Sequence, residues 1–140
     1  MKRLLLIVLP LLLIVGCSKP VDNELLKDRN GVKYKQDSQK PYTGEVFELH
    51  DNGNKKLDGY YKDGLMEGVW TWWDENGQKK EEGNFIDGEK DGLWTSWYEN
   101  GQKKQEQNFK NGELDGLSIY LDENGQKKEE GNFIDGEKDG

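Results

Sequence analysis

The 140-residue sequence contains one cysteine, Cys17, and one histidine, His50. A lone cysteine cannot form a disulfide within the chain, so a small domain held together by disulfides is excluded. An enzyme site needs a base, a nucleophile or a metal cluster, assembled from groups in different environments. Since the chain has so few of these groups, we expect no enzymatic activity, no metal site and no cofactor.

The sequence also lacks an apolar run long enough to cross a bilayer comfortably. Its longest run, residues 4–15, follows two basic residues and precedes a glycine, which is the arrangement of a secretory signal peptide. The sequence IVGC at the end of this run resembles a bacterial lipobox, whose cysteine receives a lipid and becomes the N-terminus after cleavage. We therefore predict a signal peptide over residues 1–16 and lipidation of Cys17. The alternatives are an uncleaved N-terminal anchor and an ordinary signal peptide.

Positive charge is scarce as well. The chain has 20 Lys and Arg against 28 Asp and Glu, and removal of residues 1–16 would leave 18 against 28, a net charge of −10. Such a surface repels the phosphates of nucleic acids and of anionic lipids. We expect no nucleic-acid partner, and membrane attachment through Cys17 alone. The signal and the residue after Cys17 favour the cell envelope, and the outer membrane if the source has two membranes.

Large apolar side chains are rare in residues 17–39, which we predict to be a flexible, lipidated tether with a short strand over residues 32–35. The remaining sequence, residues 40–140, does not read as helical. Glycine and asparagine recur too often for a helix, and no apolar stripe with a 3.6-residue period is present.

What the sequence does contain is a repeat. The 19 residues 74–92 recur unchanged at 122–140, and diverged copies lie at 50–68 and 98–116, so the period is 24 residues. The repeat domain is predicted to cover residues 40–140. Its units begin near positions 44, 68, 92 and 116, and a fifth unit is cut off at position 140. Because two copies are identical, we assign function to the array rather than to single units.

Each unit contains an Asn-Gly pair between apolar or alternating stretches, which is the strongest local signal for a β-hairpin. We predict a two-residue type I′ turn at each pair and a longer solvated turn at residues 86–92. A turn at residues 76–77 places Trp70 opposite Gly83. Successive hairpins then form an all-β fold, an elongated antiparallel meander of tandem 24-residue β-hairpin repeats.

The same register divides the aromatic residues between the two faces of the sheet. One face carries the aromatics expected to be structural: Tyr61, Trp70, Phe85, Trp94, Phe109 and Phe133. Gly83 on this face is expected to lie beneath an aromatic ring. The other face mixes aromatic with charged side chains, a composition typical of recognition surfaces. Its candidate binding residues are Trp73, Lys80, Trp97 and Lys104.

Residues 83–101, GNFIDGEKDGLWTSWYENG, resemble the MORN repeat, in which a glycine-aromatic pair, a glycine turn and a second glycine precede an aromatic-rich strand and a closing Asn-Gly. Residues 40–53, KPYTGEVFELHDNG, strengthen the resemblance to bacterial MORN-variant repeats. The resemblance implies an elongated, non-catalytic β-sheet that contacts proteins or membranes. Many bacterial members are described as antitoxins, so an immunity or antitoxin-like role is an alternative.

Two other functions are weighed against this one. The segment 87–92, DGEKDG, offers three acidic side chains beside glycines, so a bound cation is an alternative to an ordinary turn. The tryptophans of the repeat could stack on sugar rings, as an alternative to forming the core, which would make the chain a carbohydrate-binding surface module. They are Trp70, Trp72, Trp73, Trp94 and Trp97. His50 falls in a column otherwise filled by aspartate and tyrosine, so we expect a surface substitution rather than a catalytic base.

The main expectation is a membrane-anchored scaffold that binds a protein partner at the cell envelope. The last predicted strand, residues 127–134, would present an unpaired edge. Pairing of that edge with another protein, including self-association, is a further expectation.

Overall fold

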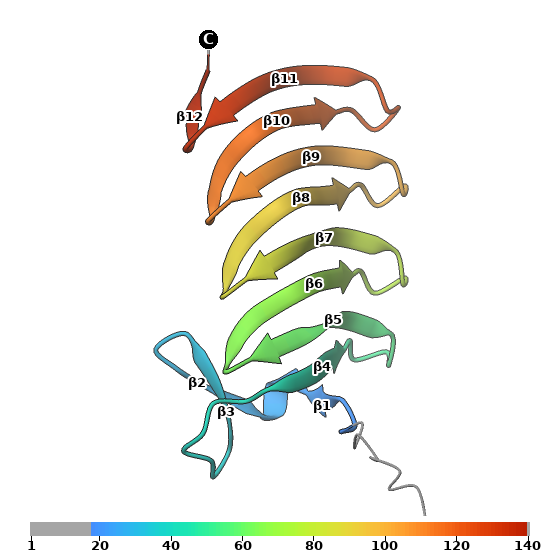
Figure 1. The fold of residues 1–140 in the computed structure, drawn as a ribbon. Coiled ribbons are helices and arrows are strands. Elements are labelled where there is room, and N and C mark those ends of the chain that lie inside the picture. The colour runs from blue at the N-terminus through green and yellow to red at the C-terminus, as the bar shows by residue number, and fades with distance from the viewer. Residues whose placement is uncertain (1–17, 140) are drawn as a thin grey trace, which may run out of the picture.

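The computed structural model describes residues 18–139, most of which form a long sheet of β-strands that lie side by side (Figure 1). The predicted signal peptide and Cys17 lie outside the described residues. Ten strands form one sheet in the order β1-β4-β5-β6-β7-β8-β9-β10-β11-β12, and β2 and β3 form a separate hairpin. Within residues 18–139, we find no helix that is long and apolar enough to cross a membrane.

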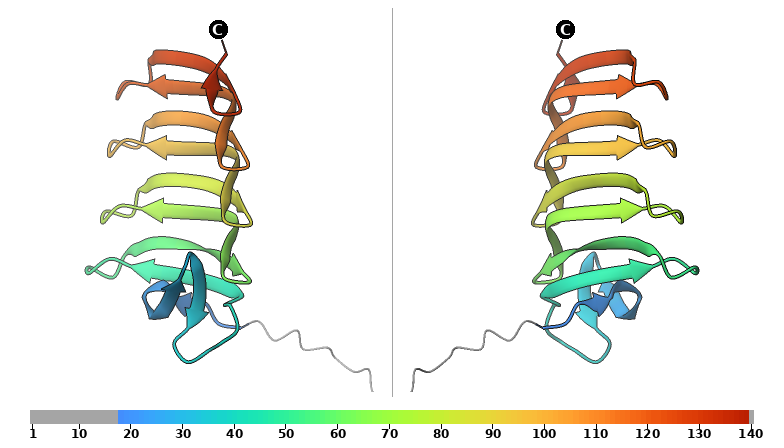
Figure 2. Two further views of the ribbon diagram at one scale, coloured as in Figure 1. Left: turned by 90° about the vertical axis from the view of Figure 1, so that its left-hand side faces the viewer. Right: turned by 90° about the vertical axis from the view of Figure 1, so that its right-hand side faces the viewer.

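The sheet is a single elongated layer, as the two side views show (Figure 2). From β4 onward, each strand pairs antiparallel with the next strand in the chain. The strands are β4 Gly44–Leu49, β5 Lys55–Lys62, β6 Leu65–Trp73, β7 Lys79–Ile86, β8 Glu89–Trp97, β9 Lys103–Lys110, β10 Glu113–Leu121, β11 Lys127–Ile134 and β12 Glu137–Lys138. The predicted all-β, elongated antiparallel meander is confirmed.

The turns that connect one unit to the next are shorter than predicted. Asp87 and Gly88 join β7 to β8, and both have positive φ, 50° and 85°, as a two-residue type I′ turn requires. The longer turn predicted over residues 86–92 is therefore wrong, because β8 begins at Glu89, which pairs with Ile86. Aspartate tolerates the left-handed region nearly as well as asparagine does, so Asp-Gly serves here as the hairpin turn.

The four Asn-Gly pairs that recur with the 24-residue period lie instead in three-residue loops, whereas Asn30-Gly31 and Asn111-Gly112 form two-residue turns. In the loop after β6, Gly77 has positive φ, whereas Asn76 does not. The Gly77 amide donates to the Asp74 carbonyl (3.0 Å), and the Asp74 amide donates to the Gln78 carbonyl (2.8 Å). This is the pattern of a type I turn followed by a left-handed glycine. The predicted type I′ turn is therefore wrong. Asp74 Oδ1 accepts the amides of Asn76 and Gln78, each at 2.9 Å, but the loops that begin at His50 and Tyr98 keep the same backbone bonds without this carboxylate.

The predicted register is nevertheless correct along most of the hairpin. Trp70 pairs with Gly83, as predicted, whereas Trp73 pairs with Lys79 at the end nearer the loop. The intervening residue Lys80 forms a β-bulge that compensates for the extra residue in the loop. The extra loop residue and the bulge therefore compensate for each other, and the rest of the hairpin has the predicted register.

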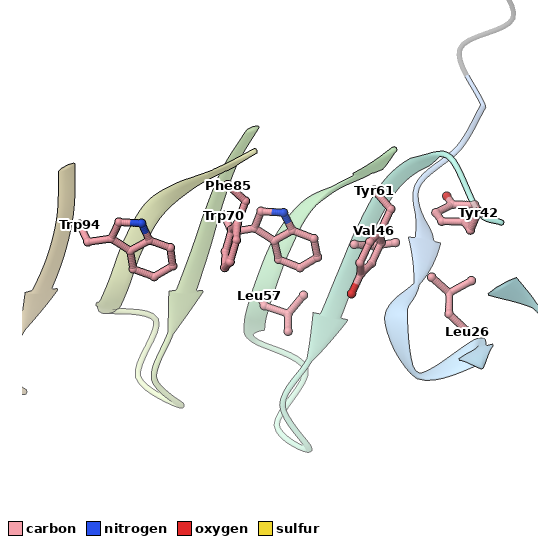
Figure 3. Close-up of a cluster of buried hydrophobic side chains, with 8 residues drawn as sticks. All are labelled: Leu26, Tyr42, Val46, Leu57, Tyr61, Trp70, Phe85 and Trp94. Atoms are coloured by element: carbon pink, nitrogen blue, oxygen red, sulfur yellow. The ribbon is translucent and has the colours of Figure 1, made fainter. Parts of the chain in front are cut away.

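The core consists of side chains that lie on one face of this single layer (Figure 3). The buried hydrophobic residues are Leu26, Tyr42, Val46, Leu57, Tyr61, Trp70, Phe85 and Trp94. The Trp94 ring covers Gly83, where an added Cβ would lie 2.2 Å from ring atoms, and its indole N–H donates to the Asn84 carbonyl (3.1 Å). Trp70 covers Gly59 in the same way. The prediction of an aromatic ring over Gly83 is confirmed, and the ring comes from the following unit.

Residues 21–35, predicted to be part of a flexible tether, form defined elements. These are β1 Val21–Asp22, the 3-10 helix η1 Asn23–Leu25, β2 Leu26–Arg29 and β3 Val32–Lys35. β1 pairs parallel with β4, and the side chain of Leu26 is buried against the core. The tether prediction is corrected for this segment, because a few apolar side chains suffice to cover the first edge of the sheet. The short strand predicted over residues 32–35 is confirmed.

Candidate functional site

The two faces of the sheet have different roles. Successive side chains of a strand point to opposite faces, so Trp70 and Phe85 share one face while Val69 and Ile86 share the other. The first is named the aromatic face and carries the core described above. The second is named the open face, and no second layer of residues 18–139 covers it (Figure 2).

Apolar and basic side chains alternate on the open face along the row nearest the three-residue loops. The directly paired residues in this row are Leu49 with Lys55, Trp73 with Lys79, Trp97 with Lys103, and Leu121 with Lys127. The Lys55 ammonium lies 5.0 Å from the centre of the Trp73 ring, and the Lys79 ammonium lies 5.8 Å from that of Trp97. These are cation–π distances, so each tryptophan lies beside a lysine of the preceding unit.

A row of carboxylates neutralises these lysines. The ion pairs are Lys55–Asp58 at 2.6 Å, Lys79–Glu82 at 2.5 Å, Lys103–Glu106 at 2.6 Å and Lys127–Glu130 at 2.5 Å. The hydrogen bond from Lys79 lowers the pKa of Glu82, with a further contribution from the Thr71 hydroxyl, and together they outweigh the effect of burial. The four lysines are thus paired with carboxylates of the same face, which leaves little free positive charge there.

Exposed apolar side chains gather on the open face. Of the eight exposed large hydrophobic residues in residues 18–139, all except Leu25 lie there. They are Leu49, Tyr60, Val69, Ile86, Leu93, Leu117 and Ile134. Val69, Leu93 and Leu117 occupy the same position in successive units and are 61%, 53% and 43% exposed. The open face is therefore a repeated surface of apolar side chains and ion pairs.

The structure separates the four predicted binding residues into two groups. Trp73 and Trp97 lie on the open face, as predicted, and are half-buried. Lys80 does not join them, because it is the bulge residue and Lys79 takes its place beside Trp97. Lys104 is likewise not the lysine beside Trp97, since Lys103 is the residue paired with Trp97. The consecutive lysines gave no signal in the sequence that would distinguish the ladder residue from the bulge.

The predicted structural aromatics lie on the aromatic face, with burial that falls along the chain. Tyr61, Trp70, Phe85 and Trp94 are buried, whereas Phe109 and Phe133 are half-buried. Phe109 still contacts the cluster, its ring centre lying 6.2 Å from that of Trp94.

His50 joins neighbouring units. Its ring nitrogen Nε2 lies 3.0 Å from the Trp73 carbonyl, and 48 residues later the Tyr98 hydroxyl donates to the Leu121 carbonyl at 2.8 Å. At the equivalent position of the other units, aspartate caps its own loop instead. The contacts at these loops thus alternate with a period of two units, the spacing of the identical segments in the sequence.

The acidic segment at residues 87–92 has no loop-like cation site. It is a two-residue turn followed by strand β8, which spreads its carboxylates along the hairpin. Among the described residues, no group of three or more His, Cys, Asp or Glu side chains is placed to hold a metal ion.

A single open sheet whose two-strand unit recurs every 24 residues defines a β-repeat protein. The family described as the MORN repeat variant matches three tandem segments, residues 66–87, 90–111 and 114–135. Each match covers one hairpin with a three-residue loop and ends at the following type I′ turn. These three segments of the chain are therefore similar to MORN-variant repeats. No curated protein matches the sequence.

Proposed function

We propose that this protein is a non-catalytic scaffold that binds protein partners through the open face. The observation that carries the proposal is that, within residues 18–139, seven of the eight exposed large hydrophobic residues lie on that face. Exposed apolar surface on this scale is typical of interaction sites, particularly when charged groups surround it. MORN repeats generally serve as modules for interaction with proteins or membranes, which supports the same reading.

We further infer that lipidation of Cys17 attaches the scaffold to the cell envelope, at the outer membrane if the source has two membranes. The sequence of residues 1–17 supports this anchor. The sheet itself is a poor membrane-binding surface, because the lysines of the open face are paired with carboxylates and the whole chain has a net charge of −8. An immunity or antitoxin-like role would be a special case of this scaffold, with one dedicated toxin as the partner.

Leu93→Asp and Leu25→Asp provide a matched test of the open face. Both leucines are highly exposed, at 53% and 65%, but only Leu93 lies on the open face. Each variant and the wild type would be expressed in the source organism, crosslinked and recovered with its bound proteins. Leu93→Asp should lose a partner that Leu25→Asp retains, while circular dichroism shows all three folded. Equal recovery with both variants would contradict the assignment of the face.

The anchor is tested separately with Cys17→Ala. This variant should lose metabolic labelling by fatty acid and accumulate as unprocessed precursor. A wild-type protein that carries no lipid would overturn the anchor and leave the open-face proposal standing.

A further inference from the structure

The first unit departs from the other units on the open face. Residues 45, 47, 58 and 60 are Glu, Phe, Asp and Tyr, whereas the equivalent residues 69, 71, 82 and 84 are Val, Thr, Glu and Asn. The third unit has Leu, Thr, Glu and Asn at these positions. Side chains shared by the units are explained by the common fold. Two aromatic rings and an additional carboxylate in one unit require another explanation.

These side chains line an open cavity of about 550 Å³, together with Val69, Lys55 and Pro20. Its size lies within the range of ligand-binding pockets. Tyr60 pairs with Glu45 on one neighbouring strand and with Glu67 on the other, so a carboxylate-bearing residue lies on each side of the tyrosine. Phe47 pairs with Asp58. The cavity thus combines aromatic rings with carboxylates on adjacent strands.

The lysine in the lining, Lys55, does not neutralise the cavity as a whole. Its ammonium is held by Asp58 at 2.6 Å and lies 5.0 Å from the Trp73 ring, on the side of the second unit. Among residues 18–139, Glu45 takes part in no ion pair, and its side chain is exposed. Tyr60 is also 38% exposed. A cationic group could therefore reach both a carboxylate and an aromatic ring.

We propose that this cavity binds the guanidinium group of an arginine side chain from the partner protein. A guanidinium is planar, stacks on aromatic rings and forms two parallel hydrogen bonds to a carboxylate, whereas an ammonium is more strongly hydrated and does neither as well. Phe47 and Tyr60 supply the rings, and Glu45 supplies the carboxylate. Val69 supplies apolar surface for the aliphatic stem of the arginine. The proposal rests on the proposed scaffold function and identifies the partner as basic at this point of the open face.

The cavity is tested with small probes and the full-length protein in detergent. Capped arginine (Nα-acetyl-arginine N-methylamide) would be titrated into isotope-labelled protein and followed by NMR, with capped citrulline as the uncharged isostere and capped lysine as the other cation. Capped arginine should shift the amide signals of residues 45–47 and 58–60. Capped lysine should bind more weakly, and capped citrulline should bind at least about tenfold more weakly, because it lacks the charge.

The variant Phe47→Thr/Tyr60→Asn replaces both rings by the residues of the second unit, which forms the same hairpin with them. It should retain the β-sheet spectrum and lose arginine binding, and Glu45→Gln should weaken that binding. Leu93→Asp, on the third unit, should leave it unchanged. Equal binding of arginine and citrulline, or full binding by the ring-replacement variant, would overturn the cavity assignment.

The outcome separates the two proposals. If Leu93→Asp abolishes partner capture but capped arginine does not bind, the scaffold function stands and the arginine cavity is wrong. If capped arginine binds at the cavity and the partner is still captured by every open-face variant, the cavity stands as an arginine site and the scaffold function assigned to that face is wrong.

Discussion

Gln107 pairs directly with Ser118 on the aromatic face, where the packing of tryptophan over glycine is replaced. In the preceding units, Trp94 covers Gly83 and Trp70 covers Gly59. Ser118 occupies the position of the tryptophan, and Gln107 occupies that of the glycine. Ser118 is fully buried, and its hydroxyl has no hydrogen-bond partner among the described residues. In this pair the larger side chain therefore comes from β9, whereas in the earlier pairs it comes from the strand that follows the glycine strand.

This relationship predicts strong coupling between two substitutions. Gln107→Gly alone should destabilise the protein, because it leaves a gap beside Ser118 and adds strand flexibility. Ser118→Trp alone should cost about 1–3 kcal/mol, because the indole meets the Gln107 side chain. The double variant should recover at least about 1 kcal/mol relative to the sum of the two, because a tryptophan then covers a glycine as in the earlier units. Urea unfolding of the wild type, the two single variants and the double variant measures the coupling. If the two changes in free energy of unfolding simply add, residues 107 and 118 are not coupled and the prediction is wrong.

Gly83→Ala should be far more destabilising than Gly131→Ala. A Cβ on Gly83 would lie 2.2 Å from the Trp94 ring, which is buried in the core. The nearest atom to a Cβ on Gly131 would be Cε of Lys138, at 3.0 Å, and a flexible lysine can move away. We expect a loss of about 1–3 kcal/mol for Gly83→Ala and less than about 1 kcal/mol for Gly131→Ala, measured by thermal melts. Similar losses at the two glycines would show that the ring does not restrict Gly83.

The fold was predictable from the sequence because the 24-residue period and the recurring Asn-Gly pairs both indicate β-hairpins. The turn types were not predictable in the same way. Asp-Gly and Asn-Gly have similar local preferences, and Asn-Gly itself occurs both in three-residue loops, as at residues 76–77, and in a two-residue turn, at residues 111–112. The paired register was still correct, because the bulge at Lys80 offsets the extra loop residue.

The open face was predictable only in part. Trp73 and Trp97 follow from the alternation of a strand, which the sequence shows directly. The lysines beside them depend on which of two consecutive lysines forms the bulge, and that choice is made by the loop rather than by the lysines. The cavity of the first unit needs contacts between strands β4, β5 and β6 and the N-terminal segment, whose folding against the sheet was not apparent from its composition.

Phe85→Ala should reduce stability more than Trp97→Ala. Phe85 is buried, and its ring centre lies 5.0 Å from that of Trp94 and 6.4 Å from those of Trp70 and Trp72. Removing it should cost roughly 3 kcal/mol or more. Trp97 is half-buried on the open face beside Lys79, so its removal should cost less and should weaken partner binding instead. Thermal melts and partner capture would be measured for both variants. Unfolding of Trp97→Ala with an intact Phe85→Ala would place the core on the opposite face.

Glu48 connects the N-terminal segment to the sheet. Its side chain is 11% exposed, accepts a hydrogen bond from Asn23 Nδ2 at 3.1 Å and forms an ion pair with Lys56. Burial alone would raise the pKa of Glu48, but the bonds from Lys56 and Asn23 and the charges of Lys56 and His50 together lower it below the ordinary value. The carboxylate is thus held in its charged form where the segment meets the first unit.

This lowered pKa predicts an acid-sensitive contact. Because the folded state holds the Glu48 proton less tightly than the unfolded chain does, the ionised carboxylate stabilises the fold fully above its unfolded pKa, near 4.3 as a rough reference value. The contribution is lost as the pH falls through the lower, folded-state pKa. Wild type should therefore lose more thermal stability than Glu48→Gln between about pH 5 and pH 3, with Glu99→Gln, on an exposed loop, as the control for removal of one negative charge. The protection of the Leu26 amide against hydrogen exchange, expressed relative to the intrinsic exchange rate at each pH, should fall over the same interval, because Asn23 loses its charged acceptor and the segment that carries Leu26 is released first. A Glu48→Gln variant that loses stability on acidification as steeply as the wild type would show that this contact does not set the acid response.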